Sequence, residues 1–167
     1  MRKPIIGVMG PGDAATESET QLAYHLGQLI AQQGWVLLTG GRNCGVMDAA
    51  NRGAQQANGL TIGILPDADD RNLSAAVDLA IVTGMGNARN IINVLSSQVV
   101  IACGMGSGTA SEVSLALKVG KPVILLGCET VSQRFFQQLA PERVTVTETP
   151  TAAIEQVHRW LKTGHSS

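Results

Sequence analysis

The chain has 167 residues, a net charge of −1 and no long run of either charge, which argues against a surface built for nucleic acid or for anionic membranes. Hydrophobic residues make up 44% of it and aromatic residues only 3%, so we expect a full core built from valine, isoleucine, leucine and alanine. We expect no membrane-spanning helix, because the sequence contains no run of about 18 apolar residues.

Predicted strands and helices alternate along the chain. We expect strands over residues 4–10, 35–40, 60–66, 78–84, 98–103, 122–127 and 143–148. Apolar residues at helical spacing predict helices over 17–33, 45–57, 88–97, 110–119, 132–140 and 150–164. No internal repeat or linker divides the chain, so we expect one domain over residues 1–167, with its core over about 4–163.

The character of the predicted strands indicates the fold class. They are continuous apolar runs joined by helices, which is typical of a parallel sheet covered on both faces. We therefore expect an α/β, Rossmann-like, doubly wound and mainly parallel sheet of six or seven strands, with an order near 3-2-1-4-5-6. In that order the strand at 78–84 lies beside the first strand, at the reversal point where such sheets bind ligands.

Four glycine-rich loops follow directly after predicted strands, at residues 10–13, 40–45, 84–87 and 104–109. In a parallel sheet all four lie at the carboxyl edge, so we expect them to gather around one crevice. The alternative is that short loops between strands and helices often contain glycine without any ligand. The candidate ligand-binding residues are Gly10, Gly12, Gly40, Gly41, Arg42, Gly86, Asn87, Gly104, Met105, Gly106, Ser107, Gly108 and Thr109.

The loop "GMGSGT" at 104–109 is suited to hold a phosphate group. Without side chains, the backbone N–H groups of glycine can approach an anion closely, and the helix that follows directs its positive dipole end at the same point. Thr109 adds a hydroxyl group. The loop is not a Walker A motif, because no lysine follows its last glycine. We therefore expect a phosphate-bearing small molecule as the ligand.

Arg89 and Glu112 are the candidates for chemistry. Arg89 lies in the first turn of its predicted helix, where an exposed cation opposes the helix dipole at a cost of about 0.3–1 kcal/mol. A carboxylate such as Glu112, or a ligand phosphate, would compensate its charge. Glu112 has a purely structural alternative, because "TASE" matches a capping box with Thr109 as the N-cap and Glu112 at the third helical position.

A dinucleotide site is a further alternative. Residues 10–15, "GPGDAA", match the first half of a dinucleotide-binding fingerprint. The second half is missing, because no aspartate or glutamate ends the strand at 35–40 to hold the ribose hydroxyls. Only half of the motif therefore supports the interpretation as an NAD(P)-binding protein.

The cysteines and histidines do not predict a metal site. Cys44, Cys103 and Cys128 match no zinc or CxxC spacing, and the three histidines are scattered. Free thiols fit a reducing compartment, and residues 1–13 lack the long apolar stretch and the cleavage site of a signal peptide. We expect a cytoplasmic protein with no metal site and no required cofactor.

Three segments resemble one protein family. "GGRNCGVMDAANRGA" resembles the GGxxGxM segment of the Lonely Guy (LOG) superfamily, also called lysine decarboxylase-like, and "GMGSGTASE" resembles its PGGxGTxxE signature. "GNARNIINVLSSQVVIA" resembles the arginine-containing helix and strand that precede this signature. The short length and the "ARN" sequence are most similar to the bacterial branch related to molybdenum cofactor carrier proteins. The resemblance covers about residues 4–163.

This resemblance implies a Rossmann-like fold in a homodimer or higher homo-oligomer. Lonely Guy enzymes hydrolyse nucleoside 5′-monophosphates to a base and ribose 5-phosphate. By resemblance, Arg89 and Glu112 would be their catalytic pair here, and Gly106, Gly108 and Thr109 would hold the phosphate. The carrier branch binds the phosphate-bearing pterin of the molybdenum cofactor and does no known chemistry on it.

The sequence departs from the hydrolase pattern at three positions. Gly104 stands in place of the signature proline, Met105 in place of the glycine at the second position of the signature, and Asn90 in place of the lysine that follows the motif arginine. We therefore expect a molybdenum cofactor carrier-like binding protein. A nucleoside monophosphate phosphoribohydrolase is the alternative from the enzyme class, and a nucleotide sensor is a third hypothesis.

Overall fold

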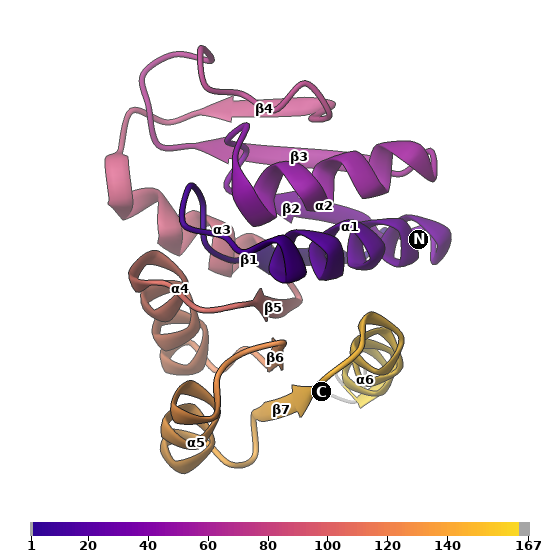
Figure 1. Cartoon of the computed structure of the whole chain (residues 1–167), viewed down its shortest axis with the longest axis vertical. Coiled ribbons are helices and arrows are strands. Elements are labelled where there is room, and N and C mark those ends of the chain that lie inside the picture. Colours follow the sequence, from indigo (N-terminus) through magenta and orange to yellow (C-terminus); the bar gives the residue numbers. More distant parts are fainter. Residues whose placement is uncertain (1, 164–167) are drawn as a thin grey trace.

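The computed structural model describes residues 2–163, and these form one seven-stranded sheet with the order β4-β3-β2-β1-β5-β6-β7 (Figure 1). Every neighbouring pair of strands is parallel. The strands are β1 (Ile5–Met9), β2 (Val36–Thr39), β3 (Leu60–Leu65), β4 (Leu79–Val82), β5 (Val99–Cys103), β6 (Val123–Leu126) and β7 (Val144–Thr147). All carboxyl ends therefore lie at the same edge of the sheet.

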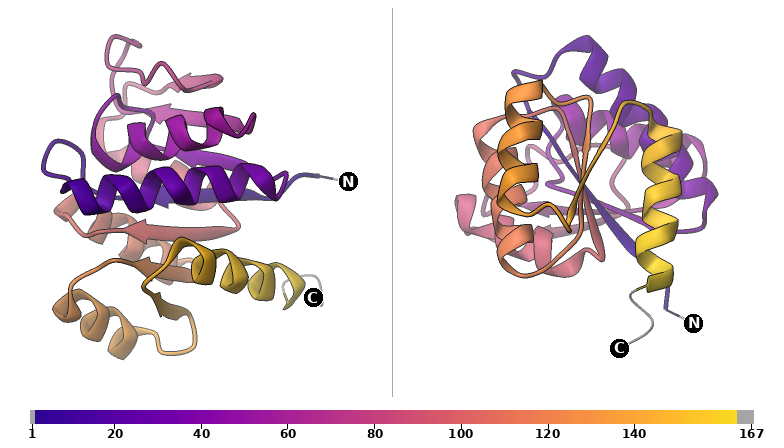
Figure 2. Two further views of the ribbon diagram at one scale, coloured as in Figure 1. Left: turned by 45° about the vertical axis from the view of Figure 1, so that its right-hand side comes forward. Right: turned by 90° about the horizontal axis from the view of Figure 1, so that it is seen from below.

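Six α-helices and one short 3-10 helix connect the strands within the described residues. They are α1 (Glu17–Gln32), α2 (Gly45–Gln56), η1 (Gly86–Arg89), α3 (Asn90–Ser96), α4 (Ser107–Lys118), α5 (Thr130–Leu139) and α6 (Pro150–Thr163). Helices α1, α2 and α6 cover one face of the sheet, and α3, α4 and α5 cover the other (Figures 1 and 2). The doubly wound, parallel α/β fold expected from the sequence is confirmed.

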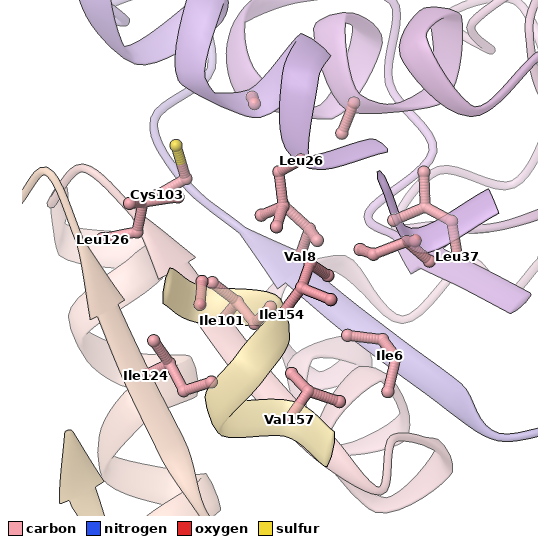
Figure 3. Close-up of a cluster of buried hydrophobic side chains, with 14 of the residues drawn as sticks. Ile6, Val8, Leu26, Leu37, Ile101, Cys103, Ile124, Leu126, Ile154 and Val157 are labelled. Atoms are coloured by element: carbon pink, nitrogen blue, oxygen red, sulfur yellow. The ribbon is translucent and has the colours of Figure 1, made fainter. Parts of the chain in front are cut away.

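Each face of the sheet buries its own aliphatic cluster. Under α1, α2 and α6, side chains such as Leu26 and Ile154 pack on Val8 and Ile101 of the central strands (Figure 3). Under α3 and α4, a second cluster surrounds Val100 and Leu125. Because the central strands are buried on both faces, their sequences are continuous apolar runs. None of the helices within residues 2–163 is both long and apolar enough to cross a membrane.

The strand that lies beside β1 in the structure is not the one expected from the sequence. β1 lies between β2 and β5, whereas β4 is an edge strand that pairs only with β3. The expectation that the 78–84 strand is the neighbour of the first strand was therefore wrong. An apolar edge strand and an apolar central strand look the same in sequence, because the pattern records side-chain type and not the neighbour. The reversal point lies between β1 and β5.

The bounds of most elements agree with the sequence expectation to within a few residues, and two helix starts differ. The helix expected over 88–97 divides into η1 and α3, with Arg89 at the junction. The helix expected to begin at Ala110 begins at Ser107. Residue 164, the expected end of the last helix, lies outside the described residues.

The expected capping box at Thr109 and Glu112 was wrong for that reason. Gly106 is the N-cap of α4 and has no side chain to cap it, so Thr109 already lies inside the helix. A capping box occurs instead at α1, where the Glu19 N–H donates to Thr16 Oγ1 over 3.2 Å and the Thr16 N–H donates to Glu19 Oε2 over 2.7 Å. The glycine turn lets α4 begin two residues before Thr109, and this leaves Glu112 outside a capping box.

Candidate functional site

A cavity of about 320 Å³ lies at the carboxyl ends of the central strands. It is bounded by the loop after β1, by the loop after β2, by η1 and by the first turns of α4. Ligand pockets in sheets of this kind form at the carboxyl ends of the two strands where the strand order reverses, and here these strands are β1 and β5. The crevice expected from the glycine loops is therefore present.

Most of the sequence-predicted residues line this cavity. They are Gly10, Gly12, Gly40, Arg42, Asn87, Arg89, Gly106, Ser107, Gly108, Thr109 and Glu112. Four of the predicted residues are not among its lining: Gly41, Gly86, Gly104 and Met105. The lining residues that the sequence analysis did not select are Met9, Pro11, Asp13, Ala14, Met47 and Asn90.

Two of the glycines that do not line the cavity have structural explanations. Gly41 has φ +76° and packs against Gly63 of β3, where an added Cβ would lie 3.0 Å from the Gly63 Cα. Gly104 has φ +73°, and an added Cβ would collide with the side chain of Glu19. Both positions need the left-handed backbone that glycine adopts without strain. Glycine in these loops therefore serves the turn in some places and the cavity in others.

The start of α4 is the part of the cavity best suited to an anion. The helix has twelve residues, and no side chain caps its N-terminus, so the first backbone N–H groups have no partner from the helix or from a cap. Gly106 and Gly108 both line the cavity, and no protein atom lies within 4 Å of the Cβ that alanine would place at Gly108. Glycine inside a helix costs about 0.5–1 kcal/mol relative to alanine, and nothing in the fold requires it at this position.

Thr109 adds an unpaired hydroxyl to the same site. Its side chain is 2% exposed, and its Oγ1 is buried without a hydrogen-bond partner among the described residues. Such a buried hydroxyl costs free energy unless something bonds to it. Because Thr109 lines the cavity, a ligand oxygen there would satisfy it together with the N–H groups of the helix start.

Arg89 is held by the ends of two strands. Its Nη1 donates to the carbonyl oxygens of Gly40, over 2.8 Å, and of Ile64, and the residue is only 9% exposed. Gly40 leaves room for this side chain, since an added Cβ would lie 2.5 Å from Arg89 Nη1. Burial lowers the pKa of Arg89, while the nearby Glu112 carboxylate opposes that shift. The partial negative charge of these carbonyl oxygens therefore compensates part of the Arg89 charge, for which the sequence had indicated a negative partner.

Glu112 is buried, and Asn93 of α3 binds it. Asn93 Nδ2 donates to Glu112 Oε1 over 2.8 Å, and Asn93 itself is fully buried. Burial raises the pKa of Glu112, against the opposing effects of this hydrogen bond and of the Arg89 charge. Asn93 was not among the residues predicted from the sequence, although it follows Arg89 by four residues and so lies near the same helix face.

The loops after β1 and β2 are fastened to each other beneath the cavity. The Val46 N–H donates to the carbonyl of Pro11 over 3.0 Å. Gly45 has φ +53°, and an added Cβ would collide with the carbonyls of Pro11 and Gly12. Arg42 also lines the cavity, so its lining holds two arginines, Arg42 and Arg89, beside the carboxyl groups of Asp13 and Glu112. The cavity thus combines an open helix start with two cationic side chains, which suits a phosphate.

The half fingerprint at 10–15 does not open a second anion site of this kind. α1 begins at Glu17, and its capping box already provides acceptors for the N–H groups of Thr16 and Glu19. A dinucleotide pyrophosphate would need that helix start to be free. The start of α4, in contrast, has no side-chain cap and lines the cavity.

Comparison with known proteins shows the family of this chain. The model of the SLOG cluster4 family matches residues 3–154. The chain belongs to this family. It is 42% identical over 149 residues to an uncharacterized protein of Archaeoglobus fulgidus, covering 89% of this chain and 91% of that protein.

Two of the similar solved structures are of proteins described as binding or carrying the molybdenum cofactor. One is the molybdenum cofactor binding protein of the phototrophic bacterium Rippkaea orientalis, with 61% identity, a TM-score of 0.95, and coverage of 96% of this chain and 99% of that one. The other is the molybdenum cofactor carrier protein of Chlamydomonas reinhardtii, with 52% identity, a TM-score of 0.92, and coverage of 96% and 99%. The family resemblance expected from the three sequence segments is confirmed.

The raised pKa of Glu112 predicts how the Glu112→Gln variant changes stability with pH. A carboxyl group whose pKa is higher in the folded than in the unfolded chain, where it is about 4.3, loses stability as pH rises above that value. Glutamine stays neutral and can still accept the bond from Asn93. We expect Glu112→Gln to raise the thermal midpoint relative to the parent at pH 7 and to lose this advantage toward pH 4.

Glu155→Gln is the matched control, because Glu155 is an exposed carboxyl group on α6. Its difference from the parent should change little between the two pH values. A Glu112→Gln variant that is less stable than the parent at pH 7 would show that the Glu112 charge is a net stabilising element of the fold.

Proposed function

We propose that this protein binds the molybdenum cofactor, a phosphate-bearing pterin, as a cargo that it carries without altering it. The observation that carries the proposal is the uncapped start of α4, where two glycines and Thr109, whose buried hydroxyl has no partner, line one cavity. The relatives described as a cofactor binding protein and a cofactor carrier, at 61% and 52% identity, support the same ligand.

The residues present fit such a cargo. In this proposal the phosphate lies at the N–H groups of Ser107, Gly108 and Thr109, where the helix dipole is positive. Arg42 and Arg89 balance the remaining negative charge. Met9, Pro11 and Met47 line the cavity with apolar surface, which suits the flat ring system of a pterin.

We further propose that the protein works in the cytoplasm as a homo-oligomer. Each copy would be a single domain with no resident metal or cofactor of its own. The cysteine pattern and the family resemblance support these points. A carrier needs only to bind and release its cargo. The site therefore requires a cradle, charge balance and an apolar wall, and it does not require a nucleophile.

A nucleoside monophosphate phosphoribohydrolase is the second candidate. Arg89 and Glu112 line the same cavity, and a carboxylate near a ribose could stabilise an oxocarbenium-like sugar and position water. Against this candidate, Asn93 holds one oxygen of Glu112, and burial favours the neutral acid over the carboxylate.

The Gly108→Ala variant tests the cradle. The added methyl group meets no protein atom, so we expect the free energy of unfolding to rise by about 0.5–1 kcal/mol. Because Gly108 lines the cavity, the same methyl group would reduce the space beside the proposed phosphate, and we expect affinity for the cofactor to fall at least about tenfold, which is about 1.4 kcal/mol. Denaturant unfolding gives the first quantity. The second comes from molybdenum that co-elutes with the protein after incubation with cofactor released from a molybdoenzyme.

Ser111→Ala is the matched control, since Ser111 is exposed on α4 and does not line the cavity. It should leave cofactor binding unchanged. If the Gly108→Ala variant bound the cofactor as tightly as the parent, the phosphate would have to lie elsewhere.

Incubation with AMP separates the two candidate functions. We expect the parent to release no more adenine than Glu112→Gln does, because a carrier has no use for hydrolysis. Chromatography of the free base gives the answer, with other nucleoside 5′-monophosphates tested in parallel. Adenine that the parent releases and Glu112→Gln does not would make the protein a hydrolase and assign Glu112 to its chemistry.

A further inference from the structure

Two carboxyl groups within residues 2–163 line the ligand cavity, and they differ in exposure. Asp13 is exposed on the loop after β1, whereas Glu112 is only 7% exposed. Glu112 lies three residues after Thr109 on α4, so the two side chains share one face of that helix. The buried carboxyl group therefore lies on the helix face that carries the unpaired Thr109 hydroxyl.

The carboxyl group of Glu112 is bound by an amide and not by a cation. Asn93 Nδ2 donates to its Oε1 over 2.8 Å, and no ion pair of Glu112 is found within residues 2–163. The guanidinium of Arg89 is directed to backbone carbonyls and acts on Glu112 only as a nearby charge. A buried carboxylate without a paired cation is costly, and such a group tends to bind a proton.

The oxygen of the Asn93 amide is consistent with a proton on Glu112. This Oδ1 is buried, and none of the described residues donates a hydrogen bond to it. An amide oxygen can only accept, so it needs a donor. A carboxylate has no donor to offer, whereas a protonated carboxyl group has one O–H. An acid and an amide can exchange two hydrogen bonds side by side, so a proton on Glu112 would supply the donor that Asn93 lacks.

An anion in the cavity would add to the cost of a charged Glu112. The proposed phosphate lies at the first turn of α4, and Glu112 follows in the next turn. Like charges in one cavity disfavour each other, and a group that can become neutral does so by binding a proton. Arginine keeps its charge in proteins, so Arg42 and Arg89 cannot respond in this way.

We propose that ligand binding in this cavity is coupled to a proton on Glu112, so that the anion binds together with this proton and loss of the proton weakens binding. The proton comes from solvent and bonds to a carboxylate oxygen, and no other reactant takes part. The coupling rests on the proposed function only for the place of the anion at α4. It adds a dependence on pH to that site. Burial raises the pKa of Glu112, which brings its titration closer to neutral pH.

No other group near Glu112 accounts for such a dependence. The ionisable side chains that line the cavity within residues 2–163 are Asp13, Arg42, Arg89 and Glu112. The elements that pack on α4 are α3, β5 and β6, and they contain no Asp, Glu, Lys, Arg or His. Cys103 of β5 belongs to the cluster on the opposite face of the sheet, and burial raises its pKa to about 12.

Sulfate is a suitable probe of the coupling, because it stays a dianion while Glu112 titrates. Calorimetry in two buffers of different ionisation enthalpy gives the number of protons taken up on binding, from about pH 5 to about pH 9. Binding should be tightest below the pKa of Glu112 in the free protein and weaken as pH rises above it. We expect the parent to take up as much as one proton and to lose about tenfold in sulfate affinity, which corresponds to a pKa shift of about one unit.

The Glu112→Gln variant should bind sulfate without taking up a proton. Glutamine is the neutral counterpart of the acid, and its amide offers Asn93 both an acceptor and a donor. Asp13→Asn is the matched control, because Asp13 is the exposed carboxyl group of the same cavity. It should take up as many protons as the parent, even where its affinity differs. Proton uptake that Glu112→Gln retains, or that Asp13→Asn loses, would overturn the proposal.

The cofactor as cargo and the coupled proton can fail separately. Sulfate needs only the anion site, and molybdenum that co-elutes with the protein reports the cofactor. A parent that takes up a proton with sulfate but binds no cofactor would refute the cargo and support the coupling. A parent that binds the cofactor but takes up no proton with sulfate over the whole pH range would refute the coupling and leave the cargo in place.

Discussion

The buried guanidinium of Arg89 holds together the parts of the chain that make the cavity. It joins η1 to the carbonyl groups of Gly40 and Ile64, which lie near the ends of β2 and β3. A charged group in this position is tolerated because carbonyl oxygens and the field of Glu112 replace the water it has lost. The glycine at position 40 follows from this constraint, since a side chain there would occupy the space of the guanidinium.

This arrangement divides the cavity into two electrostatic parts. On one side, the buried guanidinium of Arg89 donates to backbone carbonyls, and the carboxyl group of Glu112 accepts a hydrogen bond from Asn93. The charged groups of this part therefore have partners within the protein. On the other, the start of α4 has donors without acceptors, including the hydroxyl of Thr109. An anionic ligand is needed by the second part and tolerated by the first. That asymmetry favours a site that binds a phosphate group over one that depends on Glu112 as a reactive carboxylate.

The sequence predicted the fold class and most of the cavity because both depend on local signals. Continuous apolar runs indicate strands buried on both faces, and glycines after such strands indicate loops at one edge. The position of β4 could not be predicted in this way, since strand order depends on which runs pair. The role of Glu112 was open for a similar reason. "TASE" satisfies the rule for a capping box, and only the early start of α4 at Ser107 shows that the rule does not apply. The contact between Asn93 and Glu112 depends on how α3 packs against α4, which the sequence pattern does not give.

The path of the chain from β4 to α3 affects the wall of the cavity. The strand, the turn at Met85 and η1 are consecutive, so any contact that orders one of them reduces the conformational freedom of the next. Gly84 and Gly86, both with positive φ, are the residues in this connection that set its backbone path. A ligand that contacts Asn87 or Arg89 would restrain η1, and through this short connection it would reduce the conformational freedom that remains at the end of β4.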